Sequence, residues 1–363
     1  MAPPSGDLLN ENDKIIIEFL KSKSAIFTNL LQVQDEVWKS AEADKYYEGQ
    51  KARAVVTVSE AQRTVFFNMM KVLGDKLQKI YNLIPPPAKR MSYDVLDLCM
   101  APGGFTYTVL KSNRYAKVCA ISLPPSEGGI EIYLDDWQNN PRLKVELTDL
   151  TMLAGEIGFS IPASQDNPSP TAKFSNRTLF PGQQFDLIFC DGHVLPAPDS
   201  EEESGYIARR LFDAQIAMAL QKIKPAGTFV MLLHQAWTQR NLRLLEAFNQ
   251  FSQLNLFKPS TCHAKRSSFY LVAKNVEPQH KRARRLLREA RASWRLRTAN
   301  AFGIDIPETS REESVEEEPI KDIVESFGEE LVNLAEPIWT IQIDGMTRAF
   351  LRGKDGNGEQ AGV

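Results

Sequence analysis

The sequence contains few of the features that mark secreted, metal-binding or membrane proteins. It has four cysteines in 363 residues, and they form no CxxC pair: Cys99, Cys119, Cys190 and Cys262. Isolated cysteines of this kind argue against a metal site and indicate buried, reduced thiols. The first 13 residues are polar and lack the apolar core of a signal peptide, and no window has the character of a membrane span. We therefore expect an intracellular protein, nuclear or cytoplasmic, with no membrane partner.

A strong overall charge is also missing. The net charge of −3 provides no general attraction to nucleic acid. What is present is the composition of a globular protein, with 43% hydrophobic and 25% charged residues. A chain of this length has room for one large α/β domain with extensions, or for two smaller domains.

Short apolar runs alternate with helical patterns along the middle of the chain. The runs that predict strands are 93–96, 116–123, 143–147, 185–190, 228–233 and 268–273, and the clearest helices between them are 207–223 and 238–254. This alternation predicts an α/β fold with a doubly wound, mostly parallel, Rossmann-like sheet. The polar, proline-containing segment 158–184 is typical of a long surface loop.

The alternation is preceded and followed by segments of different character. Apolar residues recur with helical spacing over 13–38 and 59–83, and the second helix must end at Ile84-Pro85-Pro86-Pro87. We therefore predict a helical N-terminal extension that covers 13–88 and a main domain that covers 89–275. Residues 1–12 are predicted to be disordered, and 276–363 to form a charged, partly helical C-terminal extension with a disordered end.

The C-terminal extension contains charge blocks of opposite sign. Residues 280–297 hold eight lysines and arginines with one acid, Glu289, and an apolar stripe of Leu286, Leu287, Ala290 and Trp294. A basic helix of this kind suits RNA phosphates, an acidic protein surface or the nuclear import machinery, and the alternative is a solvated charged helix. The acidic stretch 308–330 could pair with it and mask it.

The nine-residue stretch from Asp97 to Phe105, DLCMAPGGF, lies between a predicted strand and a predicted helix. Glycine permits the crowded or left-handed turns that bring a backbone close to a nucleotide. A glycine pair after a strand also occurs in ordinary tight turns, so the flanking sequence must distinguish a nucleotide-binding turn from an ordinary one. In parallel sheets ligands bind beyond the carboxyl ends of the strands. That rule places the stretch at one edge with Ser122, Asp149 and Asp191.

With these motifs the sequence resembles the FtsJ/RrmJ-type family of S-adenosylmethionine-dependent ribose 2′-O-methyltransferases. That family typically reads Asp-Leu-Gly-Ala-Ala-Pro-Gly-Gly-Trp where this chain has residues 97–105. The resemblance covers about 90–275, and its remaining motifs are Asp149, Phe185–Asp191, Lys224–Gly227 and Arg266–Ala273.

The resemblance implies S-adenosylmethionine as the cofactor. The turn from Ala101 through Pro102 and Gly103 to Gly104, with Phe105 after it, would hold the methionine portion, with Asp97 orienting the loop. Ser122 stands where the family has an acid for the ribose hydroxyls, and serine makes a weaker contact. Asp149 would contact the adenine, and Asp191 would complete the cofactor site. Cys99 replaces the first glycine of the turn.

The resemblance leaves the chemistry open, because the family tetrad of two lysines, an aspartate and a glutamate is incomplete. Asp191 matches the aspartate, but the central lysine falls on Leu232 and the glutamate on Ser268. The other lysine cannot be assigned among Lys71, Lys76 and Lys79. Without the central lysine, the candidate base that the family uses to activate a ribose hydroxyl is missing.

Three hypotheses follow. Other catalytic groups act instead, with His193 and His234 as candidate bases at the same edge. Alternatively, positioning alone suffices, because a sulfonium methyl group is reactive. Third, the fold is retained as a non-catalytic module that binds the cofactor or RNA. We favour a methyltransferase that acts on RNA; a non-RNA acceptor also stays open. A dinucleotide dehydrogenase is disfavoured, because the turn lacks the GxGxxG spacing.

Overall fold

The chain folds around a seven-stranded sheet with the order β3-β2-β1-β4-β5-β7-β6. The computed structural model describes residues 10–40, 43, 46, 49, 60–87, 92–161, 170–193, 201–306 and 317–351. Neighbouring strands from β3 to β5 are parallel, whereas β7 is antiparallel to both of its neighbours. The strands are β1 (Tyr93–Leu98), β2 (Ala116–Ser122), β3 (Leu143–Leu147), β4 (Phe185–Cys190), β5 (Ile223–His234), β6 (Gln253–Phe257) and β7 (Ser268–Val276).

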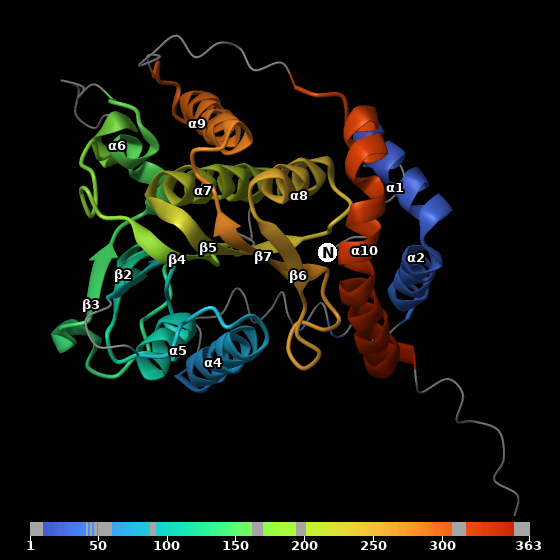
Figure 1. Ribbon diagram of the computed structural model, residues 1–363, viewed down its shortest axis with the longest axis horizontal. Helices are drawn as coiled ribbons and strands as arrows, with labels where there is room; N and C mark the ends of the chain where they lie inside the picture. The colour runs from blue at the N-terminus through green and yellow to red at the C-terminus, as the bar shows by residue number, and fades with distance from the viewer. Residues whose placement is uncertain are drawn as a thin grey trace, which may run out of the picture.

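Helices cover both faces of this sheet (Figure 1). Helices α4 and α5 pack together on one face, and α7, α8 and α9 pack on the other. The α-helices are α1 (Glu11–Lys23), α2 (Ala25–Trp38), α4 (Glu60–Tyr81), α5 (Gly104–Ser112), α6 (Ala154–Ile157), α7 (Glu201–Lys222), α8 (Gln239–Phe251), α9 (Lys281–Phe302) and α10 (Ile320–Met346). The predicted doubly wound, mostly parallel, Rossmann-like sheet with helical extensions is therefore confirmed.

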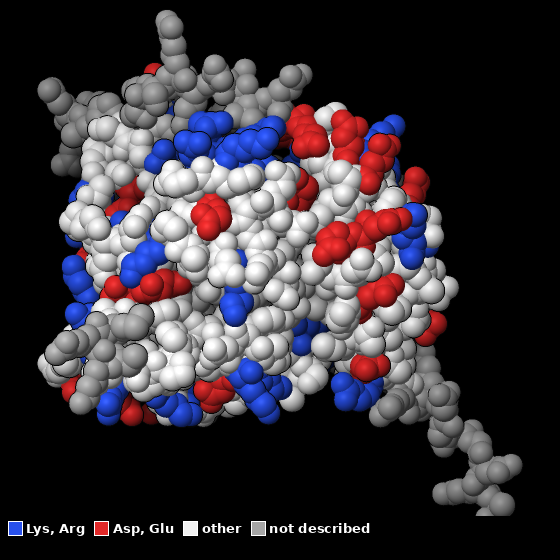
Figure 2. All heavy atoms as spheres, in the orientation of Figure 1, with Lys and Arg blue, Asp and Glu red and all other residues white. Residues whose placement is uncertain are grey.

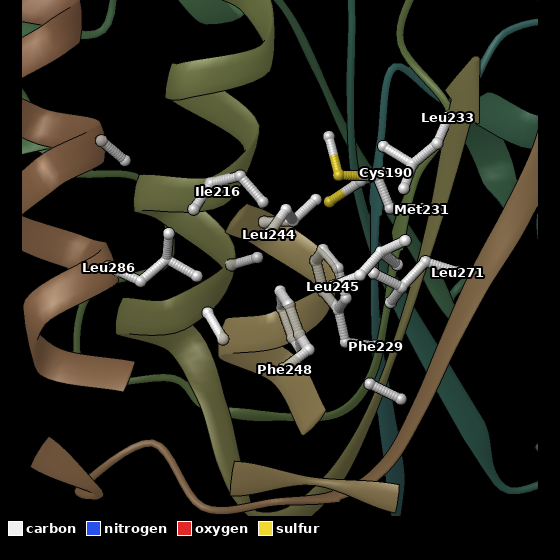
Figure 3. Close-up of a cluster of buried hydrophobic side chains, with 14 of the residues drawn as sticks. Cys190, Ile216, Phe229, Met231, Leu233, Leu244, Leu245, Phe248, Leu271 and Leu286 are labelled. Carbon is white, nitrogen blue, oxygen red and sulfur yellow. The ribbon is translucent and has the colours of Figure 1, made fainter. Parts of the chain in front are cut away.

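Two apolar cores lie on the two faces of the sheet, because side chains alternate along each strand. On β4, Leu187 and Phe189 enter the core under α4 and α5, while Ile188 and Cys190 enter the core under α7 and α8. Figure 3 shows side chains of the second core meeting from strands and helices, with Phe229 of β5 beside Phe248 of α8. These cores hold the strand ends in fixed positions, and the strand ends carry the predicted site.

A group of three helices from the two ends of the chain packs beside α8 and β6. Helix α10 runs alongside α1 and α2 and contacts both α8 and the edge strand β6 (Figure 1). Ser24, the N-cap of α2, donates a hydrogen bond to Glu336 of α10 at 2.7 Å. Phe27 is fully buried against Trp339 of α10, with ring centroids 4.8 Å apart. None of the described helices is long and apolar enough to cross a membrane.

The structure differs from several segment predictions. Strand β6 was not predicted, because residues 253–254 look like the continuation of α8; the helix ends at Phe251 instead. The segment predicted as a surface loop buries Leu179 and Phe180. The acidic stretch continues into helix α10, whose apolar face is buried.

The predicted N-terminal extension 13–88 is divided in space, with α1 and α2 against α10 and α4 on the other side of the sheet. Of the predicted disordered ends, 1–9 and 352–363 lie outside the described residues, whereas Glu11 and Asn12 begin α1. The domain limits at 88/89 and 275/276 remain predictions.

Candidate functional site

A cavity of about 290 Å³ opens at the carboxyl edge of the parallel strands. Its polar lining comes from the ends of neighbouring strands: Ser122 from β2, Asp149 after β3 and Asp191 after β4. Its apolar lining includes Ile121, Leu123, Ile130, Leu150, Ile207, Leu211 and Phe66. A largely apolar hollow with a few polar groups at strand ends is the usual form of a small-molecule site in such a sheet.

The glycine turn after β1 is shaped by close packing. Gly103 has a φ of 105°, a left-handed conformation that glycine adopts without strain. A side chain on Gly104 would collide with Met70 of α4 and would lie 2.8 Å from the backbone nitrogen of Lys71. Cys99 also has a positive φ of 65°, in the place where the family has glycine. The turn thus keeps the backbone path of a glycine turn, and the Cys99 and Ala101 side chains line the cavity.

Asp97 is the next-to-last residue of β1 and is 1% exposed. Thr106 of α5 donates a hydrogen bond to its Oδ2 atom at 2.6 Å, which ties the strand to the helix across the glycine turn. The other oxygen, Oδ1, is buried and has no hydrogen-bond partner in the part of the chain that the structure describes. Burial raises the pKa of Asp97 to about 7, although Thr106 opposes the shift. A buried acceptor without a partner is a place where a ligand donor is favoured.

Asp149 and Ser122 form the opposite part of the cavity. Asp149 Oδ1 accepts hydrogen bonds from the backbone nitrogen and the hydroxyl of Thr151, at 2.8 and 2.9 Å. The Thr151 carbonyl in turn accepts bonds from Arg210 and from the indole of Trp294 on α9. This network fixes the carboxylate of Asp149 at the cavity wall.

Asp191 follows β4 and is held by an unexpected partner. Tyr270 of β7 donates its hydroxyl hydrogen bond to Asp191 Oδ1 at 2.9 Å. Burial raises the pKa of Asp191 to about 8, with a further contribution from the charge of Asp97, while the Tyr270 bond opposes the shift. The next residue, Gly192, exchanges two hydrogen bonds with the Gln215 side chain of α7. Asp191 is therefore a carboxyl group that changes protonation near neutral pH.

The structure gathers most, but not all, of the predicted cofactor residues at the cavity. Ala101, Ser122, Asp149 and Asp191 line it directly. Pro102, Gly103 and Gly104 form the turn behind that lining, with Asp97 beneath them. Phe105 is 2% exposed, and its ring stacks on Phe189 with centroids 4.7 Å apart. Its place in the core makes it a support for the turn.

Of the predicted catalytic residues, Asp191 and His193 line the cavity, and His234 does not. His234 is the last residue of β5 and pairs in register with Ser268. Leu232, the position of the family lysine, pairs with Tyr270 across the same two strands. The candidate lysines of α4 are engaged elsewhere: Lys71 lies over the Tyr107 ring at 4.2 Å, and Lys76 donates to Thr261. The only described lysine of β5, Lys224, lies at the opposite end of the strand from Leu232 and pairs with Asp94 and Asp186.

Sequence reasoning missed Phe66 and Tyr270. Phe66 reaches the cavity from α4, and the family motif gave no signal for it, because α4 lies outside the alternating strands. Tyr270 was within a quoted motif, 266–273, but its bond to Asp191 depends on the antiparallel pairing of β7, which the sequence does not specify. Within the described residues, no group of three or more His, Cys, Asp or Glu side chains could hold a metal ion.

The predicted basic helix is present as α9, and most of its arginines are engaged within the protein. Its apolar stripe is buried, with Trp294 fully covered. Arg282 and Arg285 pair with Glu289, Arg291 donates to Gln221, and Arg297 pairs with Asp213. Three exposed residues remain on one side, and we call them the basic stripe: Lys281, Arg284 and Arg288. Figure 2 shows basic side chains gathered over α9, beside an acidic area over α1 and α10.

Comparisons with known proteins agree with this geometry. The strand order, with β7 antiparallel and a cavity at the glycine turn, defines a class I methyltransferase of Rossmann-like fold. Residues 74–276, more than half of the chain, match the model of the FtsJ-like methyltransferase family. The chain belongs to the FtsJ-like methyltransferase family, which uses S-adenosylmethionine as methyl donor.

Solved structures give weaker similarities, and the family assignment does not depend on them. One described as a ribosomal RNA methyltransferase from Plasmodium falciparum is 16% identical, covering 57% of this chain and 96% of that one, with a TM-score of 0.37. An rRNA methylase from Streptococcus thermophilus is 12% identical, covering 57% and 95%, with a TM-score of 0.33. A comparison with curated proteins gave no match.

The residues of this cavity fit the family's cofactor. Carboxylates at Asp149 and Asp191, the Ser122 hydroxyl and the unpartnered Asp97 Oδ1 are acceptors, which suit the ammonium, the ribose hydroxyls and the adenine amino group. Nothing in the described lining places a lysine or arginine against the cofactor's positive charge.

Proposed function

We propose that this protein is an S-adenosylmethionine-dependent methyltransferase that methylates a ribose 2′-hydroxyl of RNA with an altered catalytic group. One observation carries the proposal: the cavity at the glycine turn joins the cofactor acceptors to Asp191, a carboxyl group whose pKa lies near neutrality. The motifs shared with ribose 2′-O-methyltransferases support RNA as the acceptor.

Different residues of the protein would bind the cofactor and exclude water. Asp97, Ser122 and Asp149 would bind and orient the cofactor, and the glycine turn would admit it without steric hindrance. When bound, S-adenosylmethionine supplies a methyl group on a sulfonium centre, which an oxygen nucleophile can attack directly. Ile207 and Leu211 of α7 and Phe66 of α4 limit the access of water to this end of the cavity.

Asp191 is the best candidate base in this arrangement. An ordinary carboxylate is too weak a base for a hydroxyl, but a pKa of about 8 brings Asp191 close to the value that favours proton transfer at neutral pH. Tyr270, which donates to Oδ1, would position the carboxylate so that Oδ2 receives the proton. His234 is a weaker candidate, because burial and nearby positive groups lower its pKa to about 4.

The basic stripe of α9 is a second element of the proposal, as a contact for RNA phosphates. Trp294, farther along the same helix, bonds to Thr151 beside Asp149. At 1.5 Å per residue, Arg288 lies about 9 Å and Lys281 about 20 Å from Trp294 along the helix axis. The stripe could therefore contact a strand that extends away from the cavity, rather than the acceptor nucleotide itself.

Three measurements test the proposal in sequence. Calorimetric titration with S-adenosylmethionine should show binding that Gly104→Asp abolishes, and absence of binding to the parent would refute the shared premise. Transfer of label from methyl-tritiated cofactor should then appear in RNA, sensitive to ribonuclease, and should be lost in Asp191→Ala while cofactor binding is kept. Mass analysis of nuclease digests should place the methyl group on the ribose.

A non-catalytic binding module is the second candidate, and the loss of the tetrad at Leu232 and Ser268 favours it. It predicts that the cofactor binds but that no label reaches RNA, protein or small-molecule extracts. Label in protein or small molecules alone would instead show an enzyme with a non-RNA acceptor. The same transfer experiment therefore separates all three outcomes.

A further inference from the structure

Three of the four histidines lie at the same edge of the sheet, on three different elements. His193 follows β4 and lines the cavity, two residues after Asp191. His234 is the last residue of β5, and His263 lies in the loop between β6 and β7. The sequence predicted a role only for the first two, as candidate bases.

The loop that carries His263 is folded around a buried ammonium group. Lys258, which is 4% exposed, donates hydrogen bonds to the carbonyls of His263, Arg266 and Ser268 at 3.1, 2.5 and 2.6 Å. The backbone nitrogen of Gln235 donates to the Ser267 carbonyl, which joins the loop to the end of β5. His263 is therefore held near His234 by backbone contacts.

The polar atoms of this cluster lack partners of their own. His234 Nδ1, His263 Nδ1 and Ser268 Oγ are buried without a hydrogen bond to any of the described residues. Such atoms are uncommon in folded proteins, where most buried polar groups are paired. His234 and Ser268 face each other in register on β5 and β7, so two of the three unpartnered atoms belong to adjacent residues.

The charged side chains that act on His234 and His263 are positive. Burial is the main cause that lowers the pKa of His234 to about 4 and of His263 to about 3, and Arg266 and Lys258 lower both further. The three imidazoles also act on one another. Among the described residues, no carboxylate is among the charges that act on His234 or His263. The free protein therefore holds neutral imidazoles in surroundings that favour an anion.

We propose that His193, His234 and His263 form a subsite for a phosphodiester group of the acceptor strand, and that filling this subsite is coupled to proton uptake. The source of the phosphate rests on the proposed function, in which RNA is the acceptor. The subsite lies beside Asp191, so it would hold the backbone next to the hydroxyl that is methylated. In this reading the histidines bind and position the strand, and Asp191 takes the proton.

The expected pH dependence follows from the sign of the interaction. A bound phosphate favours the charged form of an imidazole and raises its pKa, so the complex holds more protons than the free protein. RNA affinity should therefore increase as the pH falls, by up to about tenfold per pH unit for each proton taken up. The groups that face the cluster are Asp191 after β4, Lys258 after β6, and Cys262 and Arg266 in the β6–β7 loop.

Imidazole signals in a proton–carbon NMR spectrum of the full chain provide the direct test. His280, the fourth histidine, caps α9 by accepting a hydrogen bond from the Arg282 backbone, and it serves as an internal control. Inorganic phosphate and a single-stranded RNA oligonucleotide should each shift the signals of His193, His234 and His263 and raise their titration midpoints, and inorganic phosphate should leave His280, which adjoins the basic stripe, unchanged. Saturating RNA that leaves all three signals unmoved would overturn the inference.

Variants extend the test to binding. The double variant His234→Gln/His263→Gln should reduce the change in RNA affinity between pH 7.5 and pH 6 from about tenfold to less than about twofold. The control Tyr93→Phe, which changes a residue away from the cluster and from the basic stripe, should retain the full change. An unchanged pH dependence in a folded double variant would count against the subsite. If phosphate shifts the imidazoles but RNA is never methylated, the subsite stands and the proposed function fails.

Discussion

Replacing Tyr270 by phenylalanine tests the role of Asp191 most directly. The change removes one hydroxyl, whose hydrogen bond to Asp191 Oδ1 is 2.9 Å long, and keeps the ring that packs edge-on against Phe105 at 6.0 Å. Hydrogen bonds to charged groups contribute about 1.5–3 kcal/mol. Since one pH unit corresponds to about 1.4 kcal/mol, the loss should raise the pKa of Asp191 by about one to two pH units.

The sign of the effect on activity follows from the protonation state. If Asp191 must be ionised to accept the proton, kcat/KM should rise with pH in the parent and level off above about pH 8, the pKa of Asp191. In Tyr270→Phe the whole rise should move to higher pH by about one to two pH units. The assay is tritium transfer to RNA at limiting substrate, where kcat/KM reports the free enzyme.

A matched control distinguishes this effect from a loss of packing. Tyr93 is partly buried and donates its hydroxyl to the Leu83 carbonyl at 2.5 Å, away from the cavity. Tyr93→Phe should cost about 1 kcal/mol of stability and leave the pH profile unchanged. An active Tyr270→Phe enzyme whose profile coincides with that of the parent would refute Asp191 as the titrating base.

Four further changes have defined outcomes. Asp97→Asn removes a carboxyl group whose folded pKa is raised to about 7, so the parent should lose stability as the pH rises from about 4 to 7. By urea denaturation at each pH the variant should lose less, because Asp191 and Asp213, whose pKa values are also raised, still titrate. Gly104→Ala should lower the melting temperature and weaken cofactor binding in calorimetry, because α4 leaves no room for a methyl group. Trp294→Ala should cost about 3–5 kcal/mol in denaturant unfolding, because the indole is fully buried. Neutralising the basic stripe with glutamine should weaken RNA binding at low salt and reduce the slope of log affinity against log salt by up to about 2.

The sheet, and the edge of it that carries the predicted cofactor site, were predictable because the sequence patterns that indicate them are local. Apolar runs ended at Asp149 and Asp191, and the rule for parallel strands then brought these residues to one edge with the glycine turn. The structure adds that Gly104 is required by α4, a contact between segments whose pairing no local pattern indicates.

The surroundings of Asp191 could be predicted only in part. The absence of a lysine at position 232 was visible, but the hydrogen bond from Tyr270 to Asp191 depends on the register between β5 and β7. Likewise His263 has no motif of its own, and it joins His234 only because Lys258 folds the intervening loop. The basic helix was predicted correctly, yet its internal ion pairs, such as Arg297 with Asp213, depend on packing against α7.

The three-helix group beside β6 has a consequence for the timing of folding. Ser24 and its partner Glu336 are 312 positions apart in the chain. At a synthesis rate of about 5–20 residues per second, roughly 15–60 s pass between the emergence of α2 and that of α10. Phe27 and Leu30, fully buried in the finished protein, lack the cover of α10 throughout that interval. The contacts that α10 makes with α2 and with the edge strand β6 can therefore form only late in synthesis.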